Sequence, residues 1–147
     1  MSMQFEHADA SQAEAATPVT FRLVGALLSF SGVLVVVSGG REIKFDVDLA
    51  LDDIQRARGL MFREKLGPYE GMLFDFYKEA PVSFWMKNTL IPLDMIFIRA
   101  DGSIDRIAEN TIPENLEPVV SGGEVSAVLE LAGGTAARLG IDESATV

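Results

Sequence analysis

The chain has 147 residues, of which 48% are hydrophobic, so we expect one folded domain around a single substantial core. Its formal net charge of -10 repels polyanions, and no cluster of Lys and Arg offsets it, so we expect neither nucleic acid nor an anionic membrane surface as a partner. Cysteine is absent and the one histidine is His7, which excludes disulfides, thiolate metal sites and His-dependent catalytic triads from the folded part.

The N-terminal segment is polar, rich in alanine and without a hydrophobic period, so we expect a disordered tail over residues 1–18 and a single β domain over residues 19–147. The apolar stretch 21–37 is interrupted by Arg22 and by glycines, and its unbroken part is shorter than the ~20 residues of a membrane span. Acidic residues precede the stretch, which is not the pattern of a signal peptide.

Two β-hairpins are predicted from apolar runs that flank turn residues. Residues 43–49 alternate apolar and polar side chains, which indicates a strand with one wet face, and Gly39-Gly40 can form the tight turn before it. Asp101-Gly102 joins the runs 95–100 and 103–109 in the same way.

Two short helices are also predicted. The first follows Asp52 or Asp53 as its cap and ends at Gly59, and the second covers residues 135–140. The remaining runs are short and separated by Gly and Pro loops. This pattern predicts a mainly β fold, a single compact sandwich or barrel with one or two short helices.

The sequence FWMKNTLIPLDMIFI, residues 84–98, places polar residues inside an apolar run. We expect Trp85 to be mostly buried and to share a strand face with Lys87, and we expect the turn at Pro92 to bring Lys87 and Asn88 close to Asp94 at one rim of the sandwich. An aromatic ring near ammonium, amide and hydroxyl groups is typical of a small polar ligand site. The alternative is a core tryptophan beside a loop whose polar groups satisfy one another.

Three carboxylates lie in apolar surroundings: Asp75, Asp94 and Glu130. A carboxyl group in a core must be paired, hydrogen-bonded or neutral. We expect Asp94 to be ionised and either paired or multiply hydrogen-bonded, and two carboxyl groups that face each other could instead divide acid and base roles. Candidate structural partners of the three are Arg56, Arg58 and Lys87.

No metal or cofactor is expected. The aspartates at positions 46–53 do not form a calcium-binding loop, because Leu51 stands where that loop needs glycine. Gly122-Gly123 and Gly133-Gly134 are predicted turns, since neither fits a nucleotide-binding fingerprint.

Five sequence blocks carry a family resemblance: RGLMFREKL (58–66), GMLFDF (71–76), FWMKNTLIPLDMIFI (84–98), DGSIDRI (101–107) and AVLELAGGTAARLGI (127–141). In order and spacing they resemble the prokaryotic family called domain of unknown function 192, over about residues 40–147. The resemblance implies a jelly-roll-like sandwich and, because many members carry an export signal, an extracytoplasmic setting. It implies no established activity. It adds weight to the candidate site residues that fall on these blocks, namely Arg58, Trp85, Lys87, Asn88, Thr89, Asp94 and Glu130.

The leading functional hypothesis is a non-catalytic binding module that presents Trp85, Lys87, Asn88 and Asp94 to a small polar or saccharide-like ligand. The alternative is a hydrolase or lyase with Asp94 or Glu130 as acid or base and Lys87 as electrostatic stabiliser. A carboxyl group with a strongly raised pKa inside a cleft would favour this alternative. A purely structural or protein-interaction role is the third hypothesis.

Overall fold

Most strands of the protein join one mixed sheet. The computed structural model describes residues 20–24 and 27–147, so the expected tail over residues 1–18 lies outside the described residues. The seven-stranded sheet has the order β1-β2-β3-β4-β9-β6-β7, and β5 and β8 form a two-stranded sheet. In the seven-stranded sheet, neighbouring strands are antiparallel except β3 and β4, which are parallel. The elements are β1 (Thr20–Val24), β2 (Leu27–Ser38), β3 (Arg41–Ala50), α1 (Asp53–Arg58), β4 (Glu70–Ala80), β5 (Ser83–Phe84), β6 (Leu93–Ile98), β7 (Ile104–Ala108), β8 (Val119–Val120), β9 (Val125–Ala132) and α2 (Thr135–Leu139).

Both predicted hairpins are present. The turn between β2 and β3 has Gly39 at φ 58 and Gly40 at φ 75, and positive φ at both central residues is the tight-turn geometry that glycine adopts without steric cost. β6 and β7 pair in antiparallel register on either side of Asp101-Gly102, with Gly102 at φ 87. The turn residues therefore confirm the prediction from the sequence.

Both predicted helices are confirmed as well. The Asp52 side chain accepts a hydrogen bond from the Gln55 backbone N–H at 2.7 Å and so caps α1, which ends at Gly59. α2 ends at Gly140, which has a left-handed backbone. No helix in the described part of the chain is long and apolar enough to cross a membrane.

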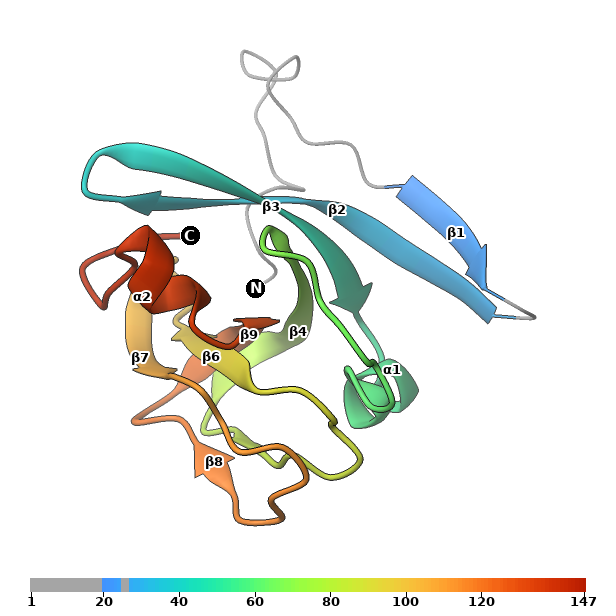
Figure 1. Cartoon of the computed structure of the whole chain (residues 1–147). Coiled ribbons are helices and arrows are strands. Elements are labelled where there is room, and N and C mark those ends of the chain that lie inside the picture. Colours follow the sequence, from blue (N-terminus) through green and yellow to red (C-terminus); the bar gives the residue numbers. More distant parts are fainter. Residues whose placement is uncertain (1–19, 25–26) are drawn as a thin grey trace.

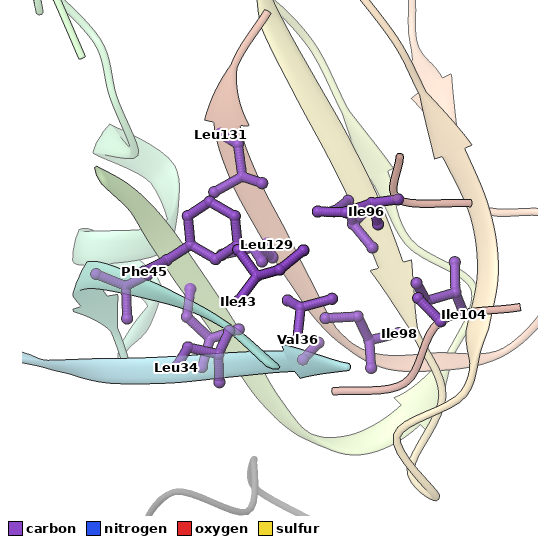
Figure 2. Packing of buried hydrophobic residues seen from close by; sticks show 14 of the residues in the cluster. Leu34, Val36, Ile43, Phe45, Ile96, Ile98, Ile104, Leu129 and Leu131 are labelled. Carbon is purple, nitrogen blue, oxygen red and sulfur yellow. The ribbon is translucent and has the colours of Figure 1, made fainter. Parts of the chain in front are cut away.

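The main sheet bends strongly, so that its long β2–β3 hairpin crosses over the strands at its other end (Figure 1) and packs against one face of β9 and β6. The hairpin side chains Leu34 and Phe45 pack toward Ile96 and Leu129 of β6 and β9, as Figure 2 shows. This two-layer packing makes the fold sandwich-like and mainly β, as predicted.

The opposite face of β4, β9 and β6 carries a second core. Phe74, Met95, Phe97 and Val128 point to this side, and Leu60 from the loop after α1 joins them. Because β6 and β9 are covered on both faces, successive residues of both strands are buried, including the polar residues Asp94, Ser126 and Glu130. The loops around this second core form the candidate site.

Candidate functional site

A cavity of about 580 Å³ opens at the edge of the second core. Its walls come from α1 and the residues after it, from β4, from residues 80–89 and from β9. The ring of Phe84 packs edge-on against Phe74, with centroids 4.9 Å apart, and against Phe76, at 6.1 Å. These rings, with Leu60, give the cavity an apolar wall.

Glu130 lines this cavity and is 4% exposed. Its neighbours on β9, Leu129 and Leu131, belong to the first core, so the alternation of the strand directs Glu130 to the other side. The carboxyl group forms no hydrogen bond or ion pair with any described residue. Burial raises the pKa of Glu130 from 4.5 to about 8, so at neutral pH the group is mainly an uncharged acid that can donate a hydrogen bond.

Arg58, Lys78 and Lys87 also line the cavity, and none of them forms an ion pair with another described residue. Arg56 differs, because its Nη2 lies 2.9 Å from Asp53 Oδ1 and its Nη1 donates a hydrogen bond to a backbone carbonyl of β4 at 2.7 Å. As far as the described residues show, the cavity therefore carries three cations without an ion-pair partner, in a protein that is strongly acidic.

The prediction that Trp85 is mostly buried is wrong, because 49% of this residue is exposed. Phe84 and Met86 pack inward against the second core, and Trp85, between them, points outward. The Nζ atom of Lys87 lies 5.1 Å from the centroid of the Trp85 ring, which confirms that the two side chains share a face.

Asp94 is fully buried on β6 and multiply hydrogen-bonded, as predicted. Its Oδ1 accepts from the backbone N–H groups of Asn110 at 2.9 Å and Gly134 at 3.1 Å, and its Oδ2 accepts from Ala136 at 2.8 Å. The expected convergence with Lys87 is not observed, since Asp94 lies outside the cavity wall. β6 carries Asp94 into the sheet, where the backbone amides at the start of α2 take the place of an ammonium partner.

Asn88 and Thr89 shape the loop that follows Trp85. Asn88 has φ 54, a left-handed conformation that asparagine tolerates better than most residues, and its carbonyl accepts from the Phe62 N–H at 2.8 Å. Thr89 is 5% exposed and donates its hydroxyl hydrogen to the Lys87 carbonyl at 3.2 Å. Thr89 lines the cavity, whereas Asn88 does not.

Asp75, the third carboxylate singled out in the sequence, is buried on β4. Its Oδ1 accepts from the Tyr77 N–H at 2.8 Å, and its carbonyl accepts the bond from Arg56. Asp75 stabilises the irregular part of β4 and does not line the cavity.

Five of the seven expected site residues thus gather around one cavity, namely Arg58, Trp85, Lys87, Thr89 and Glu130. The sequence analysis missed Lys78 and the aromatic wall. Lys78 lines the cavity together with Phe74 and Phe76, at alternate positions of β4, and this period of two is the signal in the sequence that could have found it.

The fold and the cavity define a small mainly β protein with an amphipathic pocket rimmed by cations. The chain belongs to the domain of unknown function 192 family, described as an uncharacterized ACR, whose model matches residues 34–147. This match confirms the resemblance inferred from the sequence and begins slightly earlier than the expected residue 40.

Two solved structures are similar to this chain. A Novosphingobium aromaticivorans protein of unknown function is 35% identical with a TM-score of 0.79, and the match covers 99% of this chain and 96% of that one. A Sinorhizobium meliloti protein, provisionally described as a transcription regulator, is 44% identical with a TM-score of 0.75, and the match covers 79% of this chain and 90% of that one. A comparison with curated protein sequences found no match.

Proposed function

We propose that the protein is a binding module for a small polar ligand, which it holds in the cavity between Trp85, Lys87 and Glu130. The observation that carries the proposal is the combination, in one cavity of about 580 Å³, of a half-exposed aromatic ring with cations and a carboxyl group that form no ion pair with one another or with other described residues. Cavities of this size with an apolar wall and a few convergent polar groups are typical of small-molecule sites.

The loop that presents Trp85 and Lys87 is held at several points. The Met86 N–H donates to the Asn115 carbonyl at 2.9 Å, and the Glu114 N–H donates to the Thr89 carbonyl at 3.0 Å. A loop fixed in this way loses little conformational entropy when a ligand binds, which supports a preorganised receptor.

The residues that line the cavity also support a functional site, because some of them lower the stability of the fold. Glu130 is only 4% exposed, and burying its carboxyl group costs more than burying a hydrophobic side chain of similar size. Groups of this kind, with shifted pKa values in a cleft, are frequent at functional sites.

DNA binding, which the description of the Sinorhizobium meliloti relative would suggest, is not part of the proposal. A net charge of -10 opposes contact with phosphates, since affinity for DNA depends on many cationic contacts. The few uncompensated cations at the cavity suit a small ligand.

A second candidate function is general acid catalysis by Glu130, in a hydrolase or lyase. The observation in its favour is the pKa of Glu130, which burial raises to about 8 inside a cavity. Asp94 does not join it as a partner, because three backbone amides occupy the oxygens of Asp94 away from the cavity. Turnover that is lost in Glu130→Gln while binding persists would identify this activity.

A thermal-shift screen with polar metabolites and oligosaccharides tests the binding function. We expect a binding compound to raise the melting temperature of the wild type but not of Lys87→Met. Lys44→Met is the matched control, because Lys44 is exposed on β3 and does not line the cavity. A screen in which no compound stabilises the wild type, or in which Lys87→Met responds like Lys44→Met, would contradict the proposal.

A further inference from the structure

Building on the proposed function, we propose that the ligand is an organic anion with an aromatic or other apolar body, and that it binds together with a proton held on Glu130.

The charges around the cavity favour an anion. α1 contributes Arg58 as well as the neutralised Arg56–Asp53 pair, β4 contributes Lys78, and the loop after β5 contributes Lys87. Among the described residues that line the cavity, the acidic ones are Asp53, which pairs with Arg56, and Glu130, which is mainly protonated at neutral pH. A ligand with one or two negative charges would supply the missing countercharge.

The walls of the cavity favour an apolar body on that anion. Phe74, Phe76 and Phe84 form a continuous set of edge-on rings along one side, and Trp85 stands half-exposed at the opening. Inorganic phosphate or sulfate would leave these rings in contact with water. A planar apolar group would instead bury against them and gain both hydrophobic and aromatic contact.

Glu130 is the group that holds the proton when the anion binds. As an uncharged acid it donates a hydrogen bond to an anionic oxygen, whereas its ionised form would repel the same oxygen in a site of low polarity. Its cross-strand neighbours Met72 and Met95 do not titrate, and Thr89 on the cavity wall donates its hydroxyl to a backbone carbonyl, so Glu130 is the group whose protonation changes.

The proton on Glu130 and the bound anion stabilise each other, and this determines how the affinity for the anion changes with pH. Burial already raises the pKa of Glu130 to about 8, and a bound anion raises it further because the two negative charges repel. Anion affinity is therefore constant well below this pKa. Above it, where Glu130 is ionised in the free protein, the affinity decreases by about tenfold per pH unit.

Isothermal titration calorimetry tests the proposal with naphthoate and its neutral counterpart naphthamide, from about pH 6 to about pH 9.5, a range in which neither probe changes charge. We expect naphthoate to bind the wild type more tightly than naphthamide and to weaken about tenfold per pH unit above pH 8. Glu130→Gln, an uncharged mimic of the protonated acid, should bind naphthoate with nearly constant affinity over the range. Lys78→Met should weaken naphthoate binding, whereas Lys44→Met, away from the cavity, should not.

The outcomes separate this inference from the proposed function. If naphthamide or saccharides bind and naphthoate does not, or if naphthoate affinity is the same at all pH values in the wild type, the anion inference is wrong and the binding function stands. If neither probe nor any screened metabolite binds the wild type, both are wrong. The wild-type pH series decides the matter even if Glu130→Gln fails to fold.

Discussion

The ammonium group of Lys87 lies 5.1 Å from the centre of the Trp85 ring, and both side chains line the opening of the cavity. An exposed contact of this kind is worth about 0.5–1 kcal/mol, enough to orient the lysine without neutralising its charge. The Trp85 ring thus positions the Lys87 ammonium group at the cavity and leaves its charge in place, whereas a carboxylate partner would neutralise it.

Trp85 should behave as a solvent-accessible fluorophore. Because 49% of the residue is exposed, we expect red-shifted emission that acrylamide quenches readily in the native state. A bound aromatic anion should reduce this quenching by covering the ring. Blue-shifted emission that acrylamide does not quench would show that Trp85 is buried in solution.

Asp94→Ala should lower the free energy of unfolding by at least about 3 kcal/mol. The substitution leaves three backbone N–H groups near the start of α2 without their acceptor, and each such buried donor costs about 1–3 kcal/mol. Urea unfolding measures the loss. Asp46→Ala, at an exposed position of β3, is the control and should change stability by less than about 0.5 kcal/mol. Equal stabilities of the two variants would disprove the role of Asp94 as an anchor for α2.

Glu130→Gln should remove a pH dependence of stability. Between about pH 4.5 and about pH 8 the folded protein retains the Glu130 proton that the unfolded chain releases, so the stabilising effect is complete below pH 4.5 and lost as the pH rises through 8. The wild type should lose up to about 1.4 kcal/mol per pH unit in this window relative to Glu130→Gln. Denaturant unfolding at a series of pH values provides the comparison, and parallel curves for the two proteins would mean that Glu130 is ionised in the fold.

Gly71→Ala should destabilise the pairing of β4 with β9. A Cβ atom at Gly71 would lie 2.5 Å from the Glu130 carbonyl oxygen, which belongs to the backbone of the neighbouring strand and cannot move aside cheaply. We expect a loss of about 1–3 kcal/mol in urea unfolding. Gly123→Ala is the matched control, because its Cβ would meet only ordinary contact at 3.5 Å from Asp105. The prediction is wrong if Gly71→Ala is as stable as Gly123→Ala.

Two expectations about the site failed for the same physical reason. Trp85 lies in an apolar run, but it directly follows the short strand β5 in a segment that packs on the core with one side only, so Phe84 and Met86 point inward and Trp85 points to solvent. Asp94 lies seven positions after Lys87, yet the strand it belongs to enters the middle of the sheet, where α2 supplies the partners from 40 or more residues away. Both outcomes depend on which surfaces other segments cover, and local patterns carry no information about that.

The local structure of this protein follows from short-range features of its sequence. Gly39-Gly40, Asp101-Gly102 and the caps of α1 act through backbone conformations and hydrogen bonds within a few residues, so reading the chain was sufficient to predict the turns and helices. The site, in contrast, depends on the packing of segments that are far apart in the sequence. The cavity joins α1, β4 and β9, and the charge state of Glu130 depends on how far those distant segments exclude water from it.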